Sequence, residues 1–209
     1  MLANATVLLV RHGEKDNPCA KDDSKDVCLN PMGKERAQKY VRYFGSYTAR
    51  KVDGSEPTPI KLTHLFAAAN STNSHQPHET LKPLAEANPK LPFDYTNYKD
   101  ADWKCLADDL RDKDHDGAAI LICWHHGEIV DLANRLLGKF APTSPPKSCW
   151  PPLDGRWDCR AFGWVMQIRY DANGAAGTDW VRVVSEALMF DDFSPPYTTN
   201  WQTKEKQPA

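Results

Sequence analysis

The 209-residue sequence has no long apolar run, no strong charge bias and no internal repeat. The apolar run near its amino terminus, TVLLV, follows no basic residue and is too short for a signal-peptide core or a membrane span. The 26 basic and 28 acidic side chains are spread along the chain, so no long-range field attracts nucleic acid or an anionic membrane. These absences predict a small-molecule ligand held by local groups, with neither a nucleic-acid nor a membrane partner.

The six cysteines include no CxxC pair, which is the usual spacing of a structural zinc motif. Cys19 with Cys28, and Cys149 with Cys159, are spaced so that they could close loops in an oxidising compartment. Cys123 ends an apolar run and is predicted to be a buried thiol. Free thiols are favoured, because an even cysteine count is weak evidence in a chain of this length. The predicted compartment is cytoplasmic, and secretion is the alternative.

Five short segments have the character of β-strands. Residues 6–10, 64–67 and 118–124 are apolar runs of strand length, each followed by a helical pattern or a polar loop. Residues 162–170 and 180–187 are two later strands joined by the glycine-rich turn DANGAAGTD.

Two helices have clear boundaries in the sequence. Asn30 followed by Pro31 predicts a helix start, and apolar residues at helical spacing extend that helix over residues 31–44. A second apolar stripe covers residues 129–137 directly after the HHGE segment, and Gly138 provides its stop.

The alternation of strands and helices predicts an α/β fold. We expect one domain over residues 1–209, organised as a three-layer sandwich with a mostly parallel central sheet and helices on both faces. The proline-rich segment 141–152 and the tail from residue 194 are predicted to be irregular.

Two strands run directly into a His-Gly pair. In LLVRHGEK, a buried strand is followed by Arg11, His12 and Gly13; in ILICWHHGEI, a strand is followed by His126 and Gly127, and then by a helix. Ligands of open α/β sheets bind at the carboxyl ends of strands, and a helix amino terminus adds partial positive charge there. A neutral imidazole is a nucleophile toward phosphorus, and a guanidinium matches two phosphate oxygens. The two segments therefore predict one anion-binding catalytic pocket.

These residues resemble the histidine phosphatase superfamily, which has the phosphoglycerate mutase-like fold. Its members have a strand ending in RHG and a later strand ending in HG, and LNPMGKERAQ, from Leu29, resembles the family's first helix. The resemblance implies that His12 becomes transiently phosphorylated and that Arg11 and His126 bind the phosphoryl oxygens. It also implies a carboxylate that protonates the leaving group.

Several residues beside the two His-Gly pairs are expected to border the same cavity. His125, Glu14, Glu128 and Gln76 are predicted to contact the substrate. The general acid is one of four carboxylates: Asp100, Asp102, Glu14 and Glu128.

The sequence departs from the family at the second phosphate-binding arginine. The matching stretch is STNSHQPHET, with Gln76 where the arginine is expected. Either another cation such as Arg156 or Arg160 replaces it, or the phosphatase is weak, or the pocket accepts a substrate without a phosphoryl group. The additional histidines His75, His78 and His125 would suit a substrate without a phosphoryl group, because histidine side chains titrate near neutrality. An inactive protein is a further alternative.

The predicted function is hydrolysis of a small organic phosphate monoester through a phosphohistidine at His12. Two alternatives stay open: acid–base chemistry by a histidine-rich pocket on an organic substrate, and a catalytically silent phosphate-binding protein. No cofactor and no metal site are expected, since Pro77 argues against a helical ligand pair formed by His75 and His78.

Overall fold

The computed structural model describes residues 1–18, 26–49, 58–138, 157, 159, 161–176, 181–185 and 188, with only the backbone course given for 181–185. The predictions for 141–152 and for the tail from residue 194 lie outside the described residues. So do Arg156 and Arg160, the two cations suggested as substitutes for the missing arginine.

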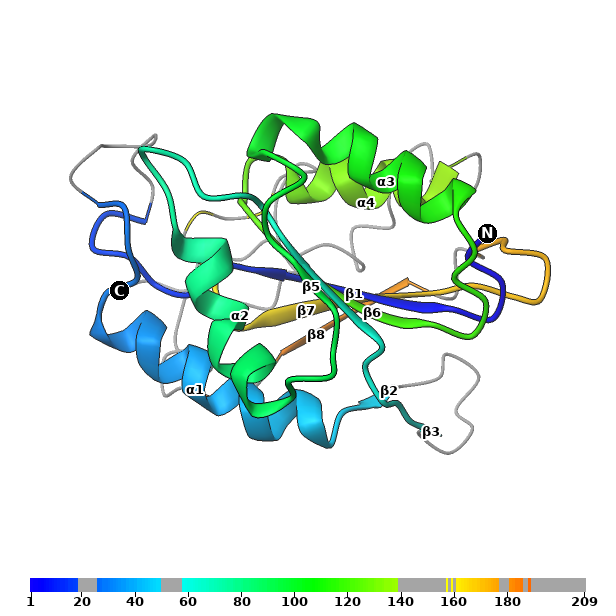
Figure 1. The fold of residues 1–209 in the computed structure, drawn as a ribbon, viewed down its shortest axis with the longest axis horizontal. Helices are drawn as coiled ribbons and strands as arrows, with labels where there is room; N and C mark the ends of the chain where they lie inside the picture. The colour runs from blue at the N-terminus through cyan, green and yellow to red at the C-terminus, as the bar shows by residue number, and fades with distance from the viewer. Residues whose placement is uncertain are drawn as a thin grey trace, which may run out of the picture.

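A six-stranded sheet, in the order β5-β4-β6-β1-β7-β8, forms the centre of the structure (Figure 1). The three pairings on the β5 side of β1 are parallel and the two on the β8 side are antiparallel. The predicted mostly parallel sheet is thus confirmed, with an antiparallel edge formed by the two late strands. The strands are β1 (Thr6–Arg11), β4 (His64–Ala67), β5 (Phe93–Asp94), β6 (Ala119–Trp124), β7 (Trp164–Arg169) and β8 (Val181–Ser185). A separate two-stranded sheet joins β2 (Thr48–Ala49) to β3 (Thr58–Pro59).

Helices cover both faces of the sheet, which confirms the predicted three-layer sandwich (Figure 1). Helices α1 (Pro31–Gly45) and α2 (Gln76–Ala87) pack together on one face, and α3 (Trp103–Asp112) and α4 (Ile129–Leu137) on the other. A short 3-10 helix, η1 (Asp100–Asp102), precedes α3. The helix starts and stops follow local signals: the Asn30 side chain accepts from Gly33 N at 2.9 Å, and Gly138 has a φ of 61°.

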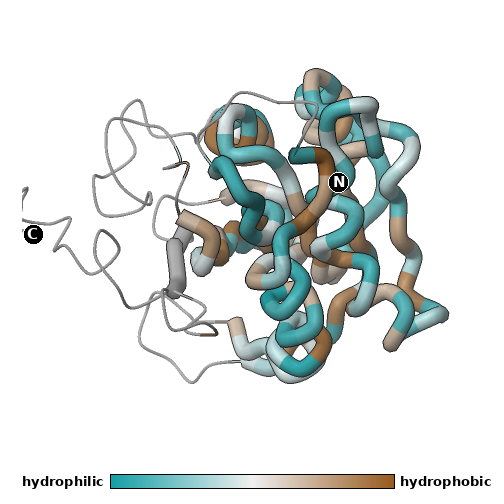
Figure 2. The backbone as a smooth tube through the Cα atoms, turned by 90° about the vertical axis from the view of Figure 1, so that its left-hand side faces the viewer, coloured by the Kyte–Doolittle hydropathy of each residue, from teal (hydrophilic) through white to brown (hydrophobic). Residues whose placement is uncertain are grey.

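Alternating residues of β1 supply two separate cores. Val7 and Leu9 belong to the cluster under α3 and α4, whereas Leu8 and Val10 belong to the cluster under α1 and α2. Successive strand side chains point to opposite faces, so a strand buried on both sides must be apolar throughout. Figure 2, in which the backbone is coloured by hydropathy, shows both apolar and polar residues along the helices, as expected of helices that cover a sheet. The TVLLV run is therefore a central strand.

The cysteines differ from the expectation of free thiols. Cys28 and Cys105 are free thiols, so the suggested pairing of Cys19 with Cys28 is wrong, whereas Cys159 is disulfide-bonded. Cys123 is fully buried at the end of β6, as predicted. Among the described residues, no helix is long and apolar enough to cross a membrane.

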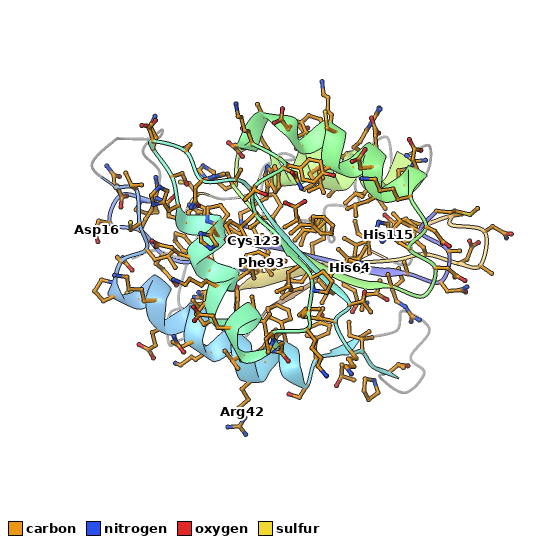
Figure 3. The ribbon with its side chains drawn as sticks, in the orientation of Figure 1. Asp16, Arg42, His64, Phe93, His115 and Cys123 are labelled. Carbon is orange, nitrogen blue, oxygen red and sulfur yellow. The ribbon has the colours of Figure 1, made fainter. Side chains whose placement is uncertain are left out.

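The sheet has two distinct ends (Figure 3). His64, at the start of β4, lies beside His115 with ring centroids 5.1 Å apart, and both lie at the right-hand end of the view. Asp16, a few residues after β1 ends, lies at the left-hand end. Because β1, β4 and β6 are parallel, their carboxyl ends meet on the side of Asp16. The predicted functional segments follow these carboxyl ends.

Candidate active site

The parallel pairing of β1 with β6 brings the two predicted histidine segments together. Arg11 lies opposite Trp124 in the register, and the backbone N–H of His12 donates to the Trp124 carbonyl at 3.2 Å. The next residue on each strand is a histidine, and the rings of His12 and His125 lie 5.2 Å apart in an edge-on arrangement. The histidine ring in contact with His12 is thus that of His125, the first of the two consecutive histidines.

The His12 ring is buried and held in one tautomer. Only 1% of the residue is exposed, and its Nδ1 lies 2.7 Å from the Gly13 carbonyl oxygen. A carbonyl only accepts, so Nδ1 carries the proton and Nε2 keeps its lone pair. Burial, followed by the charges of Arg11 and His125, holds the pKa of His12 well below its usual range, although the Gly13 carbonyl opposes this. His12 is therefore a neutral imidazole at neutral pH, as a nucleophile must be.

Arg11 supplies positive charge to the pocket, but backbone groups already hold part of its guanidinium. It donates to the carbonyls of Cys159 and, at 3.1 Å, Pro18, and its Cζ lies 3.9 Å from the centroid of the Phe162 ring. Its charge nevertheless lowers the pKa of both His12 and His125, which places it next to both rings. An anion at His12 would share Arg11 with these two carbonyls.

The absence of a side chain at Gly13 allows the loop after β1 to pack closely against α1. A Cβ at Gly13 would lie 2.9 Å from the Gly33 carbonyl oxygen, and a Cβ at Gly33 would lie 2.3 Å from the Glu14 carbonyl oxygen. The Gly13 N–H also donates to Thr80 Oγ1 at 2.8 Å, and this hydroxyl donates to the Gln76 carbonyl at 2.7 Å. The loop that carries His12 is thus fixed by α1 and by α2.

Glu14 does not occupy the predicted position at the substrate. Its carboxylate accepts from Arg36 Nε at 3.0 and 3.1 Å and from Arg36 Nη2 at 2.6 Å, and Arg36 is fully buried. The earlier expectation that Glu14 contacts the substrate or acts as the general acid is therefore replaced by a structural role. The sequence gave no sign of this pair, since its partner lies 22 residues away on α1.

Gln76 is buried at the start of α2, and its amide is bonded within the protein. Its Oε1 accepts from the Ser74 hydroxyl, and its Nε2 donates to the Asp26 carbonyl. Only 1% of the residue is exposed. Gln76 thus links two loops, and its amide is not positioned as a substitute for the missing arginine.

Lys15 is a buried cation near His125 that the sequence reasoning missed. It is only 6% exposed, its Nζ lies 3.9 Å from Asp26 Oδ2, and its charge contributes to lowering the pKa of His125. Asp26 also accepts from the backbone N–H groups of Asp16 and Asn17, which folds the loop after β1 back on itself. The one indication in the sequence was the position of Lys15 directly after RHGE, but a lysine there is usually expected to be solvent-exposed.

The remaining predicted histidines differ in their surroundings. His125 Nε2 lies 3.3 Å from the Ser74 hydroxyl, and burial, with the charges of Arg11 and Lys15, lowers its pKa to about 3. His126 is half-buried and close enough to contribute to the lowered pKa of His12. His78 points elsewhere, stacked on Tyr95 with ring centroids 4.0 Å apart. His125 and His126 thus lie near His12, whereas His78 does not.

The three other candidates for the general acid, Asp100, Asp102 and Glu128, lie in different surroundings. The Asp102 carboxylate accepts from the Lys99 N–H at 3.0 Å, within its own turn. The Asp100 carbonyl accepts from the Trp124 indole at 3.2 Å, which places η1 against the end of β6. Glu128 is half-buried directly before α4. Of these three residues, Asp100 is the one whose backbone contacts the strand that leads into His125 and His126.

The sequence and structure comparisons give different results. No family model matches the chain, and no curated protein is a significant sequence match. The protein histidine phosphatase SixA, solved with tungstate, aligns with a TM-score of 0.51 and 14% identity over 87% of this chain and 97% of its own. An Escherichia coli K-12 protein, provisionally described as an alpha-ribazole-5'-P phosphatase, aligns with a TM-score of 0.51 and 14% identity over 87% and 96%.

Mycobacterial glucosyl-3-phosphoglycerate phosphatase also aligns, with a TM-score of 0.48 and 14% identity over 87% of this chain and 96% of its own. The first two alignments cover nearly the whole of each neighbour. The chain has the fold of the histidine phosphatase superfamily.

Proposed function

We propose that this protein is a phosphatase that hydrolyses a small organic phosphate monoester through a phosphohistidine at His12. The observation that supports this proposal best is the state of the His12 ring. It is buried, it is neutral at neutral pH, and its Nδ1 is bonded to the Gly13 carbonyl. This leaves Nε2 as the nucleophilic atom, oriented before any substrate arrives.

In the proposed first step, Nε2 of His12 attacks phosphorus while the bond to the ester oxygen breaks. The departing oxygen takes the electron pair of that bond and a proton from Asp100. In the second step, the Asp100 carboxylate takes a proton from water, the oxygen of that water attacks phosphorus, and the bond to Nε2 breaks. Phosphate is released, and His12 and Asp100 return to their starting states.

Positive charge around the transferred group comes from Arg11 and Lys15. Family members use a second arginine where this chain has Gln76, and we assign that electrostatic role to Lys15. Its burial and its influence on His125 support the assignment. The half-buried His126 would donate a hydrogen bond to a phosphoryl oxygen. Such charges and donors, fixed in a pocket that excludes water, are often the largest contribution to catalysis.

The acid–base alternative is less well supported. Acid catalysis near neutrality needs a group with a pKa close to the working pH. His125 has its pKa lowered to about 3 and His12 has its pKa held well below the usual range, so both rings are already deprotonated. These rings suit nucleophilic attack and hydrogen bonding to an anion better than proton donation.

A rapid-quench experiment tests the phosphatase proposal. The full chain is mixed with an aryl phosphate, quenched in alkali, and examined by mass spectrometry for acid-labile phosphate on the peptide that contains His12. We expect phosphohistidine and turnover in the wild type and neither in His12→Ala. The control is His64→Asn, because His64 lies at the opposite end of the sheet (Figure 3). Unchanged turnover in His12→Ala would refute the proposal. Phosphate binding without any turnover, lost in Arg11→Ala, would instead identify a silent binding protein.

We further propose an oxidising compartment in place of the cytoplasmic one expected from the sequence. Cys159 is disulfide-bonded, and structural disulfides are rare in reducing compartments. Mass spectrometry of Cys159 in protein taken from its native cells under non-reducing conditions tests this. A fully reduced Cys159 would contradict the proposal.

A further inference from the structure

A thiol, an imidazole and a carboxylate meet beside the start of α2, outside the pocket described above. The side chains are Cys28, His75 and Glu79, and one ligand atom from each lies within 4.8 Å of the others. Cys28 is exposed and the other two residues are half-buried, so an ion can enter from solvent. The Cys28 thiol is hydrogen-bonded to the Glu79 carboxylate.

The backbone fixes the relative positions of these three residues. The His75 N–H donates to the Val27 carbonyl at 2.7 Å, which sets the segment of Cys28 against the start of α2. The Leu29 N–H donates to Glu79 Oε2 at 2.8 Å and orients that carboxylate. His75 and Glu79 are joined by a helical hydrogen bond of 2.9 Å from Glu79 N to His75 O, so they lie one turn apart.

Pro77 does not exclude a helical pair of ligands here, contrary to the expectation from the sequence. Helix α2 begins at Gln76, and Pro77 lies in its first turn, where proline is tolerated. The helical pair is also a different one, because Glu79 rather than His78 is the partner of His75. The third ligand, Cys28, comes from 47 residues before His75, a separation that no short motif describes.

We propose that Cys28, His75 and Glu79 bind a zinc ion. A thiolate, an imidazole and a carboxylate are all zinc ligands, and the thiolate disfavours the hard cations Mg²⁺ and Ca²⁺. Zinc binding requires the Cys28 thiol to lose its proton to solvent, so one proton is released as the Zn–S bond forms. The thiolate and the Glu79 carboxylate then balance the charge of the ion, and water takes the fourth tetrahedral position.

The proposed ion would stabilise a segment that lies next to the candidate active site. The metal-binding segment begins just after Asp26, which accepts from the Gln76 amide through its carbonyl and lies near Lys15 through its carboxylate. Linking Cys28 to α2 would restrict the movement of that segment. The ion has no role in the phosphoryl-transfer steps proposed above, so the two proposals can fail separately.

Zinc titration of the full chain against a chromogenic chelator tests the site, with Zn²⁺ as the only added ligand. We expect one equivalent of tightly bound zinc. Cys28→Ser and Glu79→Gln should each weaken its affinity at least tenfold, since even indirect perturbation of a zinc site costs about 10- to 100-fold. Cys105→Ser is the matched control, because Cys105 is also an exposed free thiol but lies on α3. Replacing zinc by Co²⁺ should give a thiolate charge-transfer band that is lost in Cys28→Ser.

Thiol alkylation gives a second readout that does not depend on any variant folding. Peptide mapping after brief iodoacetamide treatment should show that Zn²⁺ protects Cys28 and leaves Cys105 reactive. Equal alkylation of Cys28 with and without Zn²⁺ would overturn the proposal. So would zinc affinity unchanged in both Cys28→Ser and Glu79→Gln, because the ion would then occupy another site, such as the pocket histidines.

Discussion

Replacing Arg36 by methionine tests whether Glu14 stabilises the fold rather than binding substrate. In the structure, Arg36 donates three hydrogen bonds of 2.6 to 3.1 Å to the Glu14 carboxylate. The side chain of Arg36 is 0% exposed and that of Glu14 is 6% exposed. Methionine keeps much of the length of arginine but removes the charge, so the Glu14 carboxylate would remain buried without its cation.

Removal of one partner from a buried ion pair destabilises a protein by about 3–5 kcal/mol, because the remaining charge is left uncompensated. In a chain of this size each kcal/mol lowers the melting temperature by roughly 2–4 °C, so Arg36→Met should lower it by about 6–20 °C. Replacing both partners, as in Glu14→Leu with Arg36→Met, should recover most of that loss, since no charge is then buried alone. Urea and thermal denaturation of the three proteins measure these differences.

The matched control is Glu35→Gln on the same helix. Glu35 pairs with Lys39 at 2.8 Å, but both side chains are exposed, at 57% and 40%. Its loss should change the free energy of unfolding by less than about 0.5 kcal/mol. The reasoning would be refuted if Arg36→Met cost no more than Glu35→Gln, or if the double variant were no more stable than Arg36→Met.

Four further outcomes are expected. The unfolded chain takes up a proton at His125 near pH 6.5 whereas the native ring, with its pKa lowered to about 3, does not. Proton uptake at His125 alone should therefore lower the free energy of unfolding by about 2 kcal/mol from pH 6.5 to 5, and denaturation should show this contribution missing in His125→Gln. Because the pKa of His12 is lowered, this ring should add no inflection near pH 6.5 to the pH profile of kcat/KM, once the ionisation of the substrate phosphate is allowed for. Gly33→Ala should lower the melting temperature, because its Cβ would meet the Glu14 backbone, whereas Gly45→Ala, with nothing within 4 Å, should not. Lys15→Met should reduce kcat/KM on an aryl phosphate by about 100- to 1,000-fold, with partial rescue in Lys15→Arg.

The elements that the sequence predicts well are those determined by local patterns. The first helix has an asparagine cap and a proline at its start, and it was predicted within one residue of Pro31–Gly45. The helix ending before Gly138 was predicted over the same residues as α4. Helix α2 was missed, because its two prolines, Pro77 and Pro83, argue against a helix when they are considered without the packing partners on α1.

Within the candidate site, predictability depends on sequence distance. His12 and His125 each directly follow an apolar strand, so parallel pairing of the two strands was enough to bring them together. The role of Glu14 depends on Arg36, and the burial of Lys15 involves Asp26, which are contacts between separate loops and helices. Such contacts have no local periodicity, so only the folded structure reveals them.

Gln76, at the position where the family resemblance predicted an arginine, is bonded to two neighbouring loop residues. The Gln76 amide donates to the Asp26 carbonyl, and the Asp26 carboxylate lies near Lys15. An arginine at this buried position would bring a charge to the place where a neutral amide now joins two loops, and it would have to displace the Ser74 contact as well. The same bonds that exclude a cation from α2 position the loop that carries Lys15. Under the proposed function, Lys15 on the loop after β1 would supply the positive charge that α2 lacks. We therefore expect that Gln76→Arg alone would disturb these contacts rather than raise activity.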